Sequence, residues 1–257
     1  MPLGYGGRSR QRCAGDAGAD TSTGETDSLL RKKALLGTIT AAITLFAATI
    51  AVAANISGTA GPDRINGSPT ADTINSRGGD DSVNALGGND RVDGGSDDDT
   101  INGDGACLSN ATINASPYCI PGNPGNDRLF GGSGQDTING NRGKDRISGQ
   151  GGDDRLRGNN GNDRITGGSG TDILTGGSGR DFLTGSGDDD RLRGQSGNDR
   201  ITGGSGRDLI EAGGGNDRIS ARDGARDRIN CGSGRDRVTA DRNDRVARNC
   251  ERVTRRR

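Results

Sequence analysis

An aspartate that recurs every nine residues is the feature that most constrains the fold of this chain. The first series is Asp63, Asp72, Asp81, Asp90 and Asp99, and the second is Asp127, Asp136, Asp145, Asp154, Asp163, Asp172, Asp181, Asp190, Asp199, Asp208 and Asp217. An aliphatic residue follows each of them two positions later, as Ile138 follows Asp136. With 49 glycines and 27% hydrophobic residues the composition is close to that of a disordered chain, but a disordered tract has no reason to keep a register. The period therefore predicts a repetitive fold.

Glycines precede the repeated aspartate in a fixed pattern. The stretches GGSGQDTIN (131–139) and GGSGTDILT (167–175) each contain three glycines, the aspartate and an aliphatic residue two positions after it. Glycine adopts positive φ angles without steric cost, which suits a sharp turn before the aspartate. The three residues after the aspartate suit a short strand with its aliphatic side chain pointing inward. Only stacked copies of such a strand can form a core.

Over about residues 58–238 these motifs follow the pattern G-G-x-G-x-D-x-U-x, so the chain resembles the RTX, or hemolysin-type, calcium-binding repeat family. The resemblance implies an all-β fold, a right-handed parallel β-roll (β-solenoid) of nonapeptide repeats in which two repeats make one coil of 18 residues. Asp127 would then stack on Asp145, and Asp136 on Asp154. The implied cofactor is multiple Ca²⁺ ions, each held between loops one coil apart by aspartate carboxylates and loop carbonyl groups.

Stacked aspartates need a counterion. At a strand spacing of roughly 4.8 Å and an effective dielectric constant near 20, neighbouring carboxylates repel each other by roughly 3 kcal/mol. Ca²⁺ accepts carboxylate and carbonyl oxygens in a flexible geometry. For a single aspartate the alternative is a turn residue that hydrogen bonds to its own backbone. The strongest candidate pairs are Asp136 with Asp154, Asp145 with Asp163, and Asp163 with Asp181. The predicted metal ligands comprise all the aspartates of both series together with Gly131, Gly132, Gly134, Gly167, Gly168 and Gly170.

The first series departs from the pattern. Thr70 replaces the glycine two positions before Asp72, and Pro69 lies in the same loop. Ser76 and Ala85 replace the glycine five positions before their aspartates. We therefore expect the first series to bind calcium less completely than the second.

The N-terminal residues 1–54 read as an extension followed by a secretory signal peptide. Basic residues 31–33 precede an apolar run from Ala34 to Ala54 that ends in small residues. This order is typical of a cleaved signal, and a membrane anchor is the alternative. The mature protein is accordingly expected to be secreted, either extracellular or on the cell surface, without a stable membrane span.

Four cysteines follow the leader, which favours disulfides formed in an oxidising compartment. Their grouping suggests the pairs Cys107–Cys119 and Cys231–Cys250, although four cysteines permit three connectivities. The expected organisation of the remaining chain is degenerate repeats (55–102), a disulfide-clipped loop insertion (103–126), the main β-roll (127–222) and a C-terminal cap with a disulfide (223–257).

The sequence offers no catalytic constellation. It contains no histidine, which excludes Ser-His-Asp and Cys-His pairs. Gly143 and Lys144 are followed by Asp145, where a phosphate-binding P-loop requires Ser or Thr. We therefore expect a non-enzymatic, secreted calcium-binding protein whose repeats fold into a β-roll on binding calcium, with a structural or adhesive role.

An arginine often follows the repeated aspartate directly. With 18 residues per coil, these arginines align on one outer face at Arg128, Arg146, Arg164, Arg200 and Arg218. One hypothesis is a binding surface for an anionic cell-wall or extracellular polysaccharide, with no nucleic-acid partner. The other is a solvated face whose arginines balance nearby aspartates, which agrees with a net charge of −1 for the whole chain.

Overall fold

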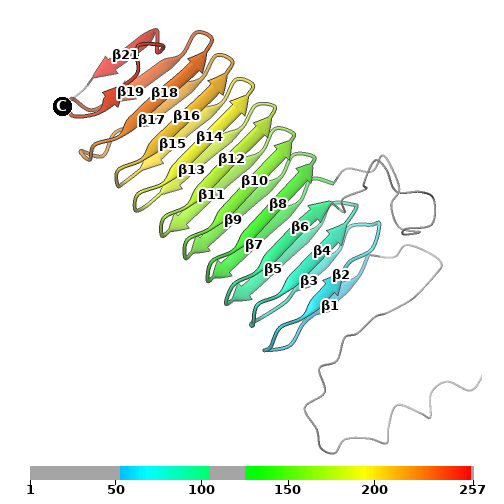
Figure 1. Ribbon diagram of the computed structural model, residues 1–257. Coiled ribbons are helices and arrows are strands. Elements are labelled where there is room, and N and C mark those ends of the chain that lie inside the picture. The colour runs from blue at the N-terminus through cyan, green and yellow to red at the C-terminus, as the bar shows by residue number, and fades with distance from the viewer. Residues whose placement is uncertain (1–52, 105–124, 256–257) are drawn as a thin grey trace, which may run out of the picture. The chain divides into compact units, whose positions relative to one another are not determined.

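Two parallel β-sheets make up the described part of the chain. The computed structural model describes residues 53–104 and 125–255, which contain strands but no helix (Figure 1). Odd-numbered strands form an 11-stranded sheet and even-numbered strands form a 10-stranded sheet. The strands are β1 (Asn55–Ser57), β2 (Arg64–Asn66), β3 (Thr73–Asn75), β4 (Ser82–Leu86), β5 (Arg91–Ser96), β6 (Thr100–Asp104), β7 (Arg128–Ser133), β8 (Thr137–Arg142), β9 (Arg146–Gly151), β10 (Arg155–Asn160), β11 (Arg164–Ser169), β12 (Ile173–Ser178), β13 (Phe182–Ser186), β14 (Arg191–Ser196), β15 (Arg200–Gly204), β16 (Leu209–Gly214), β17 (Arg218–Ala221), β18 (Arg228–Ser233), β19 (Arg237–Ala240), β20 (Arg245–Val246) and β21 (Arg252–Arg255).

Each strand pairs with the strand two places further along the chain, which confirms the predicted β-roll. In β9 and β11, for example, Arg146 lies beside Arg164 and Ile147 beside Ile165, a separation of 18 residues. Successive strands therefore alternate between the two sheets, and each pair of repeats adds one coil (Figure 1). No helix long and apolar enough to cross a membrane occurs within the two described ranges.

The core consists mainly of one aliphatic side chain from each strand, packed between the two sheets. The residue two positions after each aspartate points inward, and Leu129, Ile138, Leu156 and Ile165 are completely buried. The residues directly before and after it in the strand point outward, as the alternating burial along β11 demonstrates. Because one aliphatic side chain per strand cannot form a core alone, the stacking of coils is what buries it.

The strands are longer than the predicted three residues. Most interior strands run for six residues, as β7 does, so the pairing continues through the first two glycines of the next loop. The turn itself lies at two positions with positive φ, Gly132 (φ 122°) and Gly134 (φ 126°) in this loop. Gly131 has no such φ and is part of the strand. The first glycine of the motif is thus not needed for the turn.

The roll continues from the first aspartate series to the second. β5 pairs with β7 at a separation of 37 residues, without a break in register. The carboxylate of Asp104 accepts hydrogen bonds from the backbone N–H groups of Gly125 (3.0 Å) and Arg142 (3.1 Å). The predicted loop insertion between the two series lies almost wholly outside the described residues. The predicted Cys107–Cys119 bridge lies outside the described residues, as does the signal peptide apart from its last residues.

The C-terminal end retains the roll while the spacing changes. β16 pairs with β18 and β17 with β19 at a separation of 19 residues. The predicted bridge between Cys231 and Cys250 is confirmed, with a Cα–Cα distance of 5.3 Å. Cys231 is completely buried at the position that glycine holds in interior repeats. The bridge therefore joins the last regular coil to the segment between β20 and β21.

Candidate metal sites

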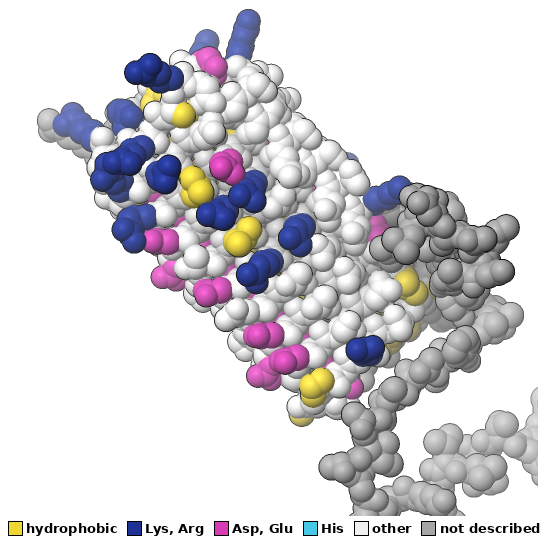
Figure 2. All heavy atoms as spheres, viewed as in Figure 1, with side chains coloured by type: hydrophobic (Ala, Val, Ile, Leu, Met, Phe, Trp, Pro, Cys, Tyr) yellow, Lys and Arg dark blue, Asp and Glu magenta, His cyan; other side chains and the backbone are white. Residues whose placement is uncertain are grey.

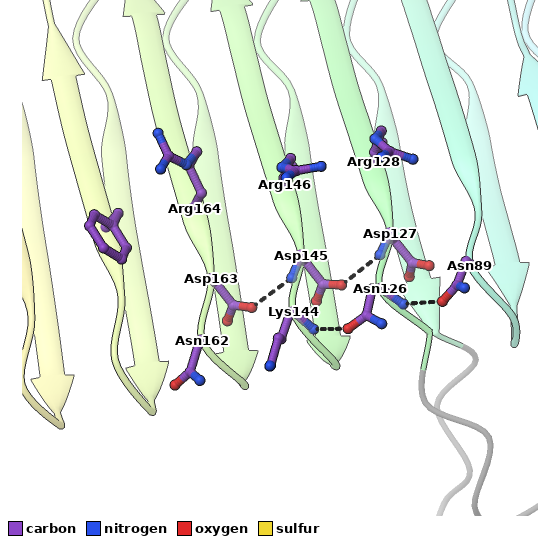
Figure 3. Close-up of a pocket in the computed structure, with 11 residues that line it drawn as sticks. Asn89, Asn126, Asp127, Arg128, Lys144, Asp145, Arg146, Asn162, Asp163 and Arg164 are labelled. Carbon is purple, nitrogen blue, oxygen red and sulfur yellow. Dashed lines mark hydrogen bonds between the residues drawn. The ribbon is translucent and has the colours of Figure 1, made fainter.

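The repeated aspartates form two columns, one along each row of loops. In one column the backbone N–H of Asp127 donates to Oδ1 of Asp145 (2.9 Å), and that of Asp145 donates to Oδ1 of Asp163 (2.9 Å) (Figure 3). In the other column the N–H of Asp136 donates to Oδ1 of Asp154 (2.8 Å). Each carboxylate thus contacts the preceding coil. For the interior repeats this excludes the alternative in which the aspartate bonds to its own turn.

The second carboxylate oxygen, Oδ2, has no hydrogen-bond partner in sixteen of these aspartates. A buried carboxylate oxygen without a partner carries a large desolvation cost. The same unpartnered oxygen recurs in nearly every loop, so it is a property of the repeat. The aspartates concerned are Asp81, Asp90, Asp99, Asp127, Asp136, Asp145, Asp154, Asp163, Asp172, Asp181, Asp190, Asp199, Asp208, Asp217, Asp227 and Asp236.

Oδ2 faces the first glycine of its own repeat. A Cβ placed on Gly149 would overlap Oδ2 of Asp154 and would lie 3.0 Å from the carbonyl oxygen of Gly167 in the next coil. Gly131 has the same relation to Asp136 and to the Gly149 carbonyl, at 2.9 Å. At a glycine the carboxylate comes closest to the strand, and a carboxylate oxygen and a carbonyl oxygen line the space that a side chain would otherwise fill. Other repeats carry a side chain at the corresponding position and keep the unpartnered Oδ2, namely those with Ser76, Ala85, Ala212 and Cys231.

Burial raises the pKa of these carboxyl groups. Desolvation is the largest cause, and it raises the pKa of Asp145 to about 8 and that of Asp154 to about 7. The hydrogen bond from the stacked aspartate acts in the opposite direction, whereas the neighbouring carboxylates of the column raise the pKa further. Without a bound cation, burial in the loops therefore makes the charged form less favourable than it is in water.

The ends of the array satisfy their carboxylates differently. Oδ2 of Asp63 accepts a hydrogen bond from the N–H of Thr59 (2.6 Å), and Oδ2 of Asp72 accepts one from the N–H of Ser68 (2.5 Å). At the other end, the N–H of Asp241 donates to Oδ2 of Asp244 (2.6 Å). In these three repeats a local backbone N–H occupies the oxygen that the interior repeats leave without a partner.

The predicted site residues come together as expected in the columns. Asp136 stacks on Asp154, Asp145 on Asp163, and Asp163 on Asp181. The predicted loop glycines belong to the same turns: Gly131 and Gly167 face carboxylates, while Gly132, Gly134, Gly168 and Gly170 have positive φ. The columns connect the remaining predicted aspartates too, which are Asp63, Asp72, Asp81, Asp90, Asp99, Asp127, Asp172, Asp190, Asp199, Asp208 and Asp217.

Sequence reasoning left several column members out of the predicted ligand set. Asp227 and Asp236 continue the columns after Asp208 and Asp217 at a separation of 19 residues. Glu251 ends one column by accepting the N–H of Asp236 (2.8 Å). Asp227 and Asp236 could have been recognised in the sequence from the aliphatic residue two positions after each, Ile229 and Val238, although the nine-residue spacing changes there.

The potential metal ligands around each loop suit a hard cation such as Ca²⁺. They are carboxylate oxygens of successive coils and backbone carbonyl oxygens, the ligand type that Ca²⁺ prefers. Nowhere in residues 53–104 and 125–255 do three or more Asp, Glu, His or Cys side chains gather as a potential metal cage. A cation at one of these loops would therefore meet one or two carboxylates and otherwise backbone oxygens.

Comparison with known families agrees with this geometry. A model described as the RTX calcium-binding nonapeptide repeat (4 copies) matches residues 54–83, 77–106, 121–156, 148–183 and 184–219. Together these segments cover more than half of the 257 residues. A search of curated proteins found no match. The β-roll of such repeats is a structural, calcium-binding fold, and the chain belongs to the RTX calcium-binding nonapeptide repeat family.

Proposed function

We propose that this is a secreted protein whose repeats fold into the β-roll when they bind several calcium ions, and that its role is structural or adhesive. The observation that carries the proposal is the unpartnered Oδ2 on sixteen stacked, buried aspartates. A column of charged, desolvated carboxylates opposes folding. A divalent cation removes the repulsion and supplies the missing partner, so that folding and calcium binding become linked.

The ligands that we propose are the carboxylates of successive aspartates in a column and the loop carbonyl oxygens beside them. Asp145 with Asp163, and Asp136 with Asp154, are representative pairs. We propose that the functional sites begin at Asp81, because a backbone N–H already occupies Oδ2 of Asp63 and Asp72. The first loops would thus close the end of the roll without metal.

The proposed extracellular location is supported by the signal-like order of basic, apolar and small residues before the repeats. The Cys231–Cys250 bridge is consistent with an oxidising compartment. Calcium-dependent folding fits this location, because extracellular calcium modules bind at about 10⁻⁴–10⁻³ M. A chain that stays unfolded until it meets that concentration would gain its structure only after export.

The test is far-UV circular dichroism of the oxidised full chain, first in EGTA and then during a calcium titration. We expect a cooperative gain of β signal in the calcium range of extracellular modules. Magnesium serves as the control cation, because it demands a more rigid geometry and gives up water reluctantly. A chain that is already folded in EGTA at neutral pH, or one that stays unfolded in millimolar calcium, contradicts the proposal.

A further inference from the structure

Arginines line the outer face of the odd-numbered sheet in a single row. Strand pairing places Arg146 beside Arg128 and Arg164, and it carries the row across nearly the whole sheet with a single break at Phe182. All of these arginines are exposed. We call this row the arginine ladder; its members are Arg91, Arg128, Arg146, Arg164, Arg200, Arg218, Arg237 and Arg252.

The ladder lacks ion-pair partners in the described part of the chain. The two salt bridges found there join Arg193 to Glu211 (2.8 Å) and Arg207 to Asp189 (3.0 Å), and neither involves a ladder arginine. The carboxylates that directly precede most of these arginines in the sequence, those of the aspartate columns, are buried and bonded to backbone N–H groups. Neighbouring guanidinium groups at the strand spacing of about 4.8 Å repel one another, so the ladder is a site that an anionic partner would stabilise.

Charge is distributed asymmetrically between the two rows of loops. In the loops before odd strands, the residue preceding the aspartate is neutral or basic, as with Asn126, Lys144 and Asn162. In the loops before even strands the same position often carries an acid, as with Asp98 and Asp153. Figure 2 shows basic side chains gathered over the C-terminal half of the face in view and acidic ones along one edge.

The opposite sheet provides a natural contrast. At the equivalent position of the even strands, Arg155 lies beside Ile173, and Ile173 beside Arg191. Leu209 then separates Arg191 from Arg228. The repeat therefore does not impose an arginine at this position, and the continuous row is a property of the odd sheet alone.

A row of hydroxyl groups and a shallow groove flank the ladder. Thr166 pairs with Ser148 and Thr184 on neighbouring strands, and the row continues through Thr202, Ser220 and Thr239. On the other side, a groove of about 440 Å³ is lined by Arg128, Arg146 and Arg164 and by loop residues that include the amides of Asn126 and Asn162 and the column aspartates (Figure 3). Guanidinium groups thus lie between a row of hydroxyls and a row of loop amides, while the carboxylates in the groove are those of the proposed calcium sites.

We propose that the odd face binds a linear anionic polysaccharide, an inference that goes beyond calcium-dependent folding. Arginine matches carboxylate and sulfate groups bidentately, and the hydroxyl row and loop amides can bond to sugar hydroxyls. Single-stranded nucleic acid fits less well, because it needs free aromatic platforms. The aromatic side chains on this described face, Phe130 and Phe182, already lie under the guanidinium groups of Arg91 (4.8 Å) and Arg164 (5.2 Å).

The test measures binding of a heparin oligosaccharide of defined length to the full chain in saturating calcium. The ladder variant carries Arg128→Gln, Arg146→Gln and Arg164→Gln. A matched control removes three charges from the even sheet through R155Q, R191Q and R228Q. We expect the ladder variant to bind about tenfold more weakly, the control to bind like the wild type, and affinity to fall with added salt.

Equal losses in both variants, or no binding by a folded wild type, overturn the proposal. Stronger binding of an oligothymidylate than of the oligosaccharide overturns it as well. Circular dichroism in calcium confirms that both variants are folded. If the wild type shows no β signal even in calcium, the calcium proposal fails and no ladder forms, whereas a chain already folded in EGTA contradicts the calcium proposal alone. Both outcomes differ from a folded chain that does not bind.

Discussion

The close approach of Oδ2 to the first glycine of each repeat can be tested with two glycines of one loop. Gly149 and Gly151 both lie in β9, and neither has a positive φ. A Cβ on Gly149 would overlap Oδ2 of Asp154, whereas the nearest atom to a Cβ on Gly151 is Oγ of Ser169, at 3.3 Å. The neighbouring strands carry Ser133 and Ser169 beside Gly151, so the backbone at that position accepts a side chain.

The two alanine variants should differ in stability by about 2 kcal/mol. A methyl group on Gly149 would overlap Oδ2 of Asp154, so we expect Gly149→Ala to force that carboxylate away from the Asp136 N–H (2.8 Å); loss of this charge-assisted hydrogen bond costs about 1.5–3 kcal/mol. The repeats with Ala85 and Ala212 at this position keep the equivalent bond, so the prediction concerns a repeat whose native residue is glycine. Both substitutions restrict the unfolded chain, which stabilises the folded state by about 0.4–1 kcal/mol. We therefore expect Gly149→Ala to destabilise the roll and Gly151→Ala to have an effect near zero.

The assay is urea unfolding followed by circular dichroism at saturating calcium, together with the calcium midpoint of folding for each variant. Gly149→Ala should also raise the calcium midpoint, because a methyl group fills the space between the Asp154 carboxylate and the Gly167 carbonyl. If the two variants show the same stability and the same midpoint, then the glycine is not required for the approach of the carboxylate, and the reasoning about the site is refuted.

Three further outcomes are expected. Asp163→Asn should stabilise the roll in EGTA and weaken it in calcium, since it removes a buried charge and a proposed ligand. D63N should leave the calcium titration close to that of the wild type, because the Thr59 N–H already occupies Oδ2; if the titrations of the two variants coincide with each other, this reasoning is contradicted. The pKa of the Asp145 carboxyl is about 8 in the folded chain and 3.8 ordinarily, so in EGTA such carboxyl groups should stabilise the roll fully below pH 4 and lose that effect as the pH rises to 8. A β signal that increases with pH in EGTA would refute this direction of the pH dependence. Reducing the Cys231–Cys250 bridge, with its sequence separation of 19, should cost about 3 kcal/mol in urea unfolding, and an unchanged midpoint would show that the cap does not depend on it.

The contacts within the columns could be predicted only in part. The nine-residue period was sufficient to predict that Asp136 stacks on Asp154 and that Ile138 and Leu156 point inward, because a constant repeat fixes both the coil length and the face of each side chain. It predicted the ladder alignment for the same reason. It could not predict that one carboxylate oxygen binds a backbone N–H of the preceding coil while the other stays unpartnered.

The sequence alone therefore predicts the repeat: the β-roll, its core positions and the aspartates that share a loop column. Which atom each carboxylate oxygen contacts depends on the tertiary structure. That Asp104 accepts the N–H groups of Gly125 and Arg142, and that Glu251 ends a column, depend on which residues adjacent coils bring together. The same holds for the absence of ion pairs along the ladder in the described residues. The contacts of Asp104 and Glu251 join residues 15 or more apart in the chain, where local sequence pattern carries no geometric information.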